Sequence, residues 1–534
     1  MEHPAAVPIE SGLVEGLPGR DRSVTVYRGI PYAAAPVGPL RWRPPQPPLP
    51  WEGVRRAHRF GPMCPQAPNP EIAGTDLPMH EDCLRLNAWS GAREAGERRP
   101  VLVWIYGGGF RAGSGSSARY DGENLARSGL VVVTFDYRLG ALGFLATPEL
   151  SAEDDRQVSG NYGLLDCIAA LQWVQRNIAG FGGDPDRVTI AGQSAGAGAC
   201  NFLAMSPLAR GLFQRVIAQS HARYSRDPEL RYLSTSYRTL PEAEAAGARF
   251  AEQRGARTTQ LLRALPWHKL ISGDDAGDTA VETGSTAKPP LFRPVVDGWA
   301  VPAGYEQTYA KGLQNEVCYL AGNNLDESGA VPEESFASIR ADRRHTRPGM
   351  PPTHVTVYDF RAAAERKFGP MAEEFLRLYP AAADDEAARA SNDAIRDNAR
   401  ISTWLWAQDW SKHCDRSLYT YFWTHRAPGR GSAPRRAAHS SEIDFVFGNH
   451  DPLQAAWSER DRQVAETMAG YWANFAATGD PNGPGLPAWP RYTAEAGAVM
   501  ELGGGLSGAF QPIPVAEAPR IDFWKRFFDT QSAW

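Results

Sequence analysis

The sequence predicts an α/β fold, in which a mostly parallel central sheet carries helices on both faces. Two apolar runs of strand length, Arg99–Tyr106 and Leu130–Phe135, lie in the first third of the chain. The segment Asn161–Ile178 places apolar side chains at helical spacing, and the apolar run Val188–Ala191 comes next. Strands that alternate with helices in this way are typical of parallel sheets that are covered on both sides.

Later elements continue the same alternation. The expected elements are a strand at Glu316–Ala321, a helix at Pro370–Gln408, a strand at Leu418–Trp423 and a helix at Ile521–Phe528, whose apolar face should pack on the body of the protein. We see no internal repeat and no linker long enough to separate domains. The prediction is therefore one catalytic domain over residues 1–534, with helical cap insertions at about 225–290 and 331–410.

Composition excludes several classes of protein. The 534 residues include 16 Trp, 18 Tyr and 21 Phe, which is typical of a globular chain with a large core. The formal charge of −5 and the lack of a lysine-rich tract make nucleic acid an unexpected partner. No apolar run approaches the roughly 18 residues that cross a bilayer, so we expect no transmembrane segment.

The segment Gly192–Gly196 has the pattern Gly-x-Ser-x-Gly between a predicted strand and a run of small residues. A strand, a sharp turn carrying a serine and a following helix form a nucleophile elbow. The two glycines leave room across the strained turn, and the helix N-terminus directs free N–H groups toward a developing oxyanion. Ser194 is therefore the candidate nucleophile. The alternative is a glycine-rich turn with an exposed serine.

A serine nucleophile needs a base and an orienting acid, and in α/β hydrolases these follow the serine in the order acid, then histidine. The acid is expected after a later strand, where either Asp326 or Glu327 fits. Pattern alone does not choose among the downstream histidines, which are His221, His268, His345, His354, His413, His425, His439 and His450.

A second glycine run, Gly107–Gly109, follows the strand at Arg99–Tyr106. Its backbone N–H groups can converge on an oxyanion because no side chains intervene. Each such donor contributes roughly 3–4 kcal/mol to the transition state in measured oxyanion holes. The alternative is again a simple glycine turn.

Several long blocks, in order along nearly the whole chain, resemble the type-B carboxylesterase and cholinesterase family of α/β hydrolases. The blocks are Glu81–Asn87, Gly160–Asp166, Phe181–Pro185, Gly192–Gly196, Tyr471–Ala476 and Thr478–Asn482. The resemblance implies an α/β-hydrolase fold and a serine esterase that needs no cofactor and no metal.

The resemblance also assigns individual residues. It implies Glu327 as the acid, His439 as the base, and the N–H groups of Gly108, Gly109 and Ala195 as oxyanion donors. The family's disulfide maps to Cys64 and Cys83, two of six cysteines. Its structural ion pairs map to Arg41–Glu81 and Arg138–Asp166, which we interpret as stabilising rather than catalytic.

Two positions depart from the family pattern. Gln193 stands directly before the nucleophile where the family usually has glutamate, so a carboxylate beside the charged imidazole is missing. His221 stands where the family has glycine after Gln219-Ser220, in a segment that often borders the acyl pocket. Together with Arg223, His221 is a candidate for the substrate pocket.

The expected substrate is a small-molecule carboxylic ester, hydrolysed through an acyl-enzyme on Ser194. Some relatives, including fumonisin-type esterases, cleave polycarboxylate esters, and arginines flank the suspected pocket and His439. These are Arg223, Arg226, Arg231, Arg430, Arg435 and Arg436. One hypothesis is that they receive an anionic ester. The alternative, which we favour, is a solvated arginine-rich surface.

Other functions remain open from the sequence. A lipase acting at lipid interfaces is an alternative, whereas a catalytically silent binding protein is disfavoured because all three triad residues are present. We expect a monomer or weak homodimer. The expected location is secreted or periplasmic, with a leader removed, if Cys64 and Cys83 are bonded, and cytoplasmic otherwise.

Overall fold

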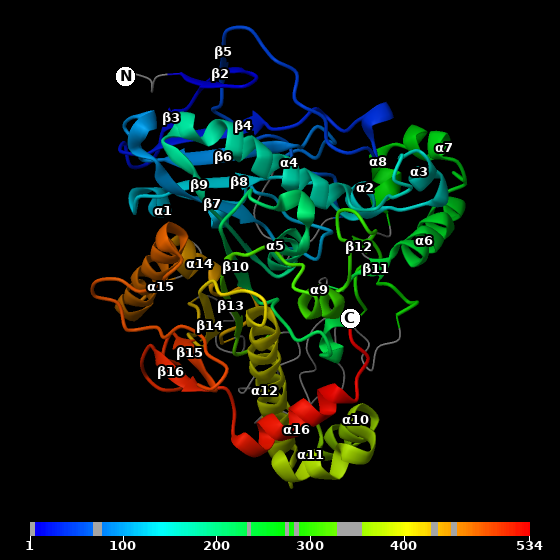
Figure 1. The fold of residues 1–534 in the computed structure, drawn as a ribbon, viewed down its shortest axis with the longest axis vertical. Coiled ribbons are helices and arrows are strands. Elements are labelled where there is room, and N and C mark those ends of the chain that lie inside the picture. Colours follow the sequence, from blue (N-terminus) through cyan, green and yellow to red (C-terminus); the bar gives the residue numbers. More distant parts are fainter. Residues whose placement is uncertain are drawn as a thin grey trace.

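The computed structural model describes residues 6–67, 77–231, 236–272, 277–281, 288–327, 355–428, 436–449 and 456–534, without the side chain of Arg231. Its centre is an 11-stranded sheet, drawn in Figure 1. In spatial order the strands are β16 (Gln511–Pro514), β15 (Ala498–Leu502), β14 (Leu418–Trp423), β13 (Cys318–Asn324), β10 (Arg215–Gln219), β9 (Gly183–Gln193), β7 (Arg99–Ile105), β8 (Val131–Phe135), β6 (Arg85–Ser90), β4 (Thr25–Pro31) and β3 (Leu17–Pro18).

The strands from β15 to β8 run parallel, and antiparallel pairs occur at the two edges. The predicted mostly parallel sheet is therefore confirmed. Two smaller sheets join β1 (Val7–Ile9), β2 (Gly12–Glu15) and β5 (Val54–Arg56), and β11 (Arg238–Thr239) with β12 (Val295–Val296).

Helices connect these strands. They are α1 (Glu123–Arg127), α2 (Gly140–Phe144), α3 (Pro148–Ala152), α4 (Tyr162–Asn177), α5 (Ala195–Met205), α6 (Leu240–Gln253), α7 (Thr259–Ala264), α8 (Trp267–Ile271), α9 (Tyr305–Ala310), α10 (Val357–Phe368), α11 (Ala372–Leu378), α12 (Asp384–Ser411), α14 (Ile443–Phe447), α15 (Glu459–Thr478) and α16 (Ala518–Asp529).

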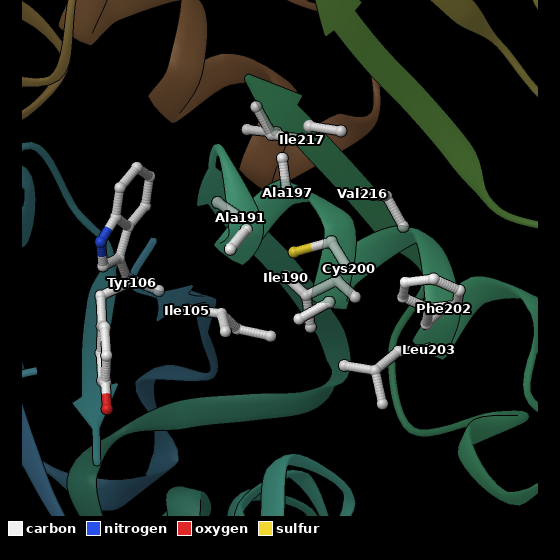
Figure 2. Packing of buried hydrophobic residues seen from close by; sticks show 14 of the residues in the cluster. Ile105, Tyr106, Ile190, Ala191, Ala197, Cys200, Phe202, Leu203, Val216 and Ile217 are labelled. Carbon is white, nitrogen blue, oxygen red and sulfur yellow. The ribbon is translucent and has the colours of Figure 1, made fainter. Parts of the chain in front are cut away.

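The two faces of the sheet are covered by different helices. Neighbouring residues of a strand point to opposite faces. In β9, the Thr189 hydroxyl donates to the Ala476 carbonyl of α15 at 3.2 Å, whereas Figure 2 shows Ile190 beside Cys200 of α5. The central strand is therefore buried on both sides, which explains its nearly continuous apolar composition.

Two groups of helices, α6–α8 and α10–α12, lie in the ranges where insertions are expected. The second group lies at one end of the molecule, where α16 crosses it (Figure 1). The predicted apolar face of α16 packs there, with Trp524 and Phe528 fully buried. That the whole chain is one catalytic domain stays a prediction.

Both ion pairs expected from the family resemblance are present and buried. Arg138 binds Asp166 through two nitrogens, at 2.8 and 2.7 Å, and Arg41 binds Glu81 at 2.7 and 2.5 Å. Removing one partner of such a pair leaves an uncompensated buried charge, which costs about 3–5 kcal/mol. The Arg138–Asp166 pair joins the segment after β8 to α4.

The expected disulfide is not formed in the structure. Cys64 and Cys83 are buried free thiols. A hydrogen bond with Cys64, together with burial, raises the pKa of the Cys83 thiol, so the two thiols lie close together. The disulfide that the family resemblance implied is therefore wrong for this structure, because a disulfide requires oxidation of the neighbouring thiols as well as their proximity.

Candidate active site

Ser194 lies at the sharp turn between β9 and α5, with φ 57° and ψ −126°. A non-glycine residue with positive φ is strained, and such strain is characteristic of a nucleophile elbow. The turn is fixed on both sides: the Ser194 N–H donates to the Gln219 carbonyl at 2.9 Å, and the Ser194 carbonyl accepts from Gly198 at 2.9 Å. The predicted strand–turn–helix is therefore present.

Close packing explains the two glycines of the elbow. A Cβ on Gly192 would lie 2.5 Å from the Gly196 carbonyl carbon and 2.6 Å from the Ile105 carbonyl oxygen. A Cβ on Gly196 would collide with the same Ile105 oxygen. Figure 2 shows the apolar packing beneath this turn, where Ile105, Ile190 and Ala197 gather. The elbow thus rests directly on the end of β7.

The glycine run Gly107–Gly109 lies directly against the elbow. A Cβ on Gly107 would clash with the Gln193 carbonyl oxygen and lie 3.1 Å from the Ser194 Cβ. Gly108 and Gly109 have φ of 117° and 67°, which other residues rarely adopt. Within the described residues their N–H groups make no hydrogen bond, and Ala195 opens α5, where N–H groups lack helical partners.

The sheet places the acid and the base beside the elbow. In the parallel register Gln193 pairs with Gln219, and Gln219 pairs with Gly322, so the carboxyl ends of β9, β10 and β13 lie together. Glu327 follows β13, and its Oε2 lies 2.5 Å from Nδ1 of His439. The structure therefore joins Glu327 to His439, one of the histidines that the pattern left open.

Asp326, the other candidate acid, binds two arginines. Its Oδ1 lies 2.5 Å from Nη2 of Arg436 and 3.0 Å from Nη2 of Arg396. The two neighbouring carboxylates thus have different partners: Asp326 binds two arginines, whereas Glu327 binds the imidazole of His439. Glu327 is held further because its Oε1 accepts from the Asn324 N–H at 2.9 Å.

Glu327 and His439 each stabilise the charged form of the other. Burial disfavours a charged imidazole, but the Glu327 carboxylate outweighs it and raises the pKa of His439 above its usual value. Burial likewise opposes ionisation of Glu327, but contact with His439 holds the pKa of the carboxyl below its usual value. An imidazolium in this position is stabilised by an ionised partner.

The Ser194 hydroxyl and His439 are not hydrogen-bonded to each other within the described residues. Nε2 of His439 lies 3.2 Å from the amide nitrogen of Gln193, the residue before the nucleophile. In structures without substrate, catalytic hydrogen bonds are often absent and form only in the complex. The same amide nitrogen lies 3.5 Å from Nδ1, so the imidazole packs against the Gln193 amide beside the elbow.

A buried hydrogen-bond network, which the sequence pattern did not predict, joins the ends of β10 and β13 to the segment that follows His439. The fully buried Glu442 accepts from Nε2 of Gln219 at 2.9 Å and from Nδ2 of Asn324 at 2.5 Å. Trp472 donates to Oε1 of Gln219 at 3.0 Å. Burial raises the pKa of Glu442. The one available signal was the position of Glu442, three residues after His439.

The candidate pocket residues His221 and Arg223 follow β10. His221 is buried, and its ring centroid lies 6.3 Å from that of Tyr305. Within the part of the chain that the structure describes, neither ring nitrogen has a hydrogen-bond partner. Burial, with the charge of Arg223 adding to it, lowers the pKa of His221 to about 3. The imidazole is therefore neutral at ordinary pH.

The flanking arginines that the structure describes are paired. Arg223 is 11% exposed and donates to Asp227 at 3.1 Å, so it does not belong to a solvated surface. Arg226 binds Glu306 at 2.8 Å. The Arg231 side chain, Arg430 and Arg435 lie outside the described residues.

Among the described residues, no cluster of His, Cys, Asp or Glu could hold a metal ion. In the same part of the chain, no helix is long and apolar enough to cross a membrane.

Comparisons with known proteins identify the family to which this chain is similar. Residues 3–519 match the model of the carboxylesterase family. A fumonisin B1 esterase of Sphingopyxis macrogoltabida is 37% identical over 520 residues, covering 92% of this chain and 85% of the relative. A para-nitrobenzyl esterase of Bacillus subtilis (strain 168) is 32% identical over 514 residues, covering 93% and 94%.

A solved structure of PNB esterase superposes with a TM-score of 0.76 at 29% identity, covering 97% of this chain and 99% of that one. The predicted α/β-hydrolase fold is confirmed by this match together with the sheet order.

Proposed function

The chain belongs to the carboxylesterase family and is a carboxylic ester hydrolase, and we propose that it acts through an acyl-enzyme on Ser194, with His439 as base and Glu327 as orienting acid. The observation that carries this proposal is the 2.5 Å contact between His439 and Glu327 beside the strained turn of Ser194. A nucleophile, a base and an acid in this arrangement define the serine-hydrolase mechanism.

In the proposed cycle, His439 accepts the Ser194 hydroxyl proton as the serine oxygen attacks the ester carbonyl. The N–H groups of Gly108, Gly109 and Ala195 stabilise the oxyanion. His439 then gives its proton to the departing alcohol, and water, activated by His439, hydrolyses the acyl-enzyme. Glu327 stabilises the charged imidazole throughout. The chemistry needs only groups that the chain itself supplies.

An ester panel that varies acyl size and charge, run on the wild type and on Ser194→Ala, tests the proposal. The wild type should hydrolyse simple esters, and the variant should lose activity on all of them by roughly 10⁴-fold or more. Hydrolysis retained by a folded Ser194→Ala protein would overturn the mechanism.

We propose anionic esters as the second candidate substrate class. One of the similar proteins is named fumonisin B1 esterase. Arg223 is nearly buried. Burial opposes its charge, but the carboxylates of Asp227, Glu229 and Glu327, in that order of effect, raise the pKa of Arg223. A guanidinium in such a position suits recognition of a substrate carboxylate.

Arg223→Gln tests this candidate class. The ratio of kcat/KM for an anionic ester to that for a neutral ester of equal length should fall by roughly 10-fold or more, because a charge-assisted hydrogen bond contributes about 1.5–3 kcal/mol. Arg249→Gln, on the exposed side of α6, is the matched control. If Arg223→Gln and the control keep the same ratio, the substrate is not recognised through Arg223.

A further inference from the structure

A pocket of about 240 Å³ lies at β4 and β6, away from the proposed triad. Arg28 of β4 and Trp89 of β6 line it, together with the segment 116–118 that follows the glycine run. In the sheet, β4 and β6 lie beyond β7 and β8, whereas β10 and β13 lie on the other side of β9. The volume is just below the range of about 300–1,000 Å³ that is typical of ligand sites, so the pocket suits a small molecule.

The Arg28 guanidinium lines this pocket without a partner for its charge. Among the residues that the structure describes, its side chain makes no hydrogen bond or ion pair, and its Nε is buried. The guanidinium carbon lies 4.8 Å from the centre of the Phe60 ring, in a cation–π contact that holds the group in place. A buried donor that lacks an acceptor costs free energy, so an acceptor bound in the pocket would stabilise it.

Trp89 supplies a second donor without a partner. It is 2% exposed, and its indole N–H has no acceptor in the described part of the chain, although a buried tryptophan N–H usually finds one. The Ser116 hydroxyl, on the same pocket, accepts from Nδ2 of Asn87 at 3.4 Å and can donate its own proton. Three donor groups from separate segments therefore line one small pocket.

One carboxylate also lines the pocket, and it limits the charge of a ligand. Asp121 pairs with Arg20 at 3.5 Å, and its Oδ1 accepts from the Glu123 N–H at 3.0 Å. The described lining thus combines the cation of Arg28 with a partly neutralised carboxylate. Because like charges repel, a ligand with a single negative charge fits this balance better than a doubly charged phosphate.

We propose that this pocket is a second binding site, for a small monocarboxylate that carries an aromatic or alkyl group. Its carboxylate accepts from Arg28 and from the indole N–H of Trp89, and its apolar part lies among the apolar lining, which includes Phe60 and Leu77. A planar guanidinium binds a carboxylate through two parallel hydrogen bonds. Carboxylic acids are also what an ester hydrolase releases, so this class of ligand is present wherever the enzyme acts.

The test is a calorimetric titration of the full chain with benzoate, benzamide and phenyl phosphate. The wild type should bind benzoate roughly 10-fold or more tightly than benzamide, which has the same shape without the charge, because hydrogen bonds to charged groups are the stronger ones. Phenyl phosphate, which carries a second charge, should bind no more tightly than benzoate.

Two variants and a matched control assign the site. Arg28→Met should weaken benzoate binding by roughly 10-fold or more, and Trp89→Phe by several-fold, since it removes one neutral donor. Both should keep the wild-type kcat/KM for a neutral ester, with the thermal midpoint as the check on folding. The control is Arg55→Met: Arg55 also lies over an aromatic ring, 4.7 Å from the centre of Trp51, but does not line the pocket, so benzoate binding should be unchanged.

Equal affinity of the wild type for benzoate and benzamide, or no binding of benzoate, would overturn the inference without any variant. Unchanged benzoate binding in a folded Arg28→Met protein would also overturn it, as would tighter binding of phenyl phosphate. Benzoate that inhibits competitively with the ester, over the concentrations at which it binds, would lie at the catalytic site instead of this pocket.

Discussion

Replacing His439 with alanine is expected to lower kcat by roughly 10⁴-fold or more, while the protein stays folded. Without the imidazole no group takes the Ser194 proton, and the hydroxyl remains a weak nucleophile. The oxyanion donors are untouched, so a residual rate above that in water should persist. The measurement is kcat for a simple ester at saturating substrate, with the thermal midpoint as the check on folding.

A second histidine provides a stringent control. His425, on the loop after β14, also contacts a carboxylate, since its Nε2 lies 2.6 Å from Asp461. It was one of the histidines that the chain order allowed. His425→Ala should keep kcat within several-fold of the wild type. If His425→Ala loses activity as His439→Ala does, or if His439→Ala retains it, the assignment of the base is wrong.

Replacing Gly107 with alanine is expected to lower kcat by about 10²–10³-fold, the loss that accompanies removal of an oxyanion donor. The new Cβ would occupy the space of the Gln193 carbonyl oxygen and press on the Ser194 Cβ, 3.1 Å away. The glycine run and the elbow must then separate, which displaces the N–H groups of Gly108 and Gly109. Catalytic geometry tolerates little displacement of this kind.

The matched control for this variant is Gly96→Ala. Gly96 is exposed, and a Cβ there would meet no atom within 4 Å. Gly96→Ala should therefore leave both kcat and the thermal midpoint unchanged. A Gly107→Ala enzyme with wild-type kcat would show that the close contact between the glycine run and the elbow is not needed.

Local pattern was sufficient to predict the turn that carries the proposed nucleophile, because the elbow lies within a few residues. Ser194 and its glycines form one continuous turn, and the structure has that turn where the pattern put it. The choice between Asp326 and Glu327 was beyond local pattern, since adjacent carboxylates look alike in sequence. Their partners, Arg436 and His439, lie more than a hundred residues away.

Long-range contacts explain what the sequence could not reveal. Glu442 meets Gln219 and Asn324 because β10 and β13 are neighbours in the sheet, although these residues are far apart in the chain. Gln193 stood out as a departure from the family, but its contact with His439 depends on the same folding of distant loops. The family resemblance paired Cys64 with Cys83, but a sequence pattern does not determine whether two neighbouring thiols are oxidised.

The most direct test of the central claim is to find the residue that becomes covalently modified. The enzyme is treated with a serine-directed phosphonate ester, its intact mass is measured, and the modified peptide is sequenced by mass spectrometry. We expect one adduct per chain, on the peptide that contains Ser194, and none in Ser194→Ala. An adduct on a different residue, with loss of activity in proportion to it, would contradict the assignment of Ser194 as the nucleophile.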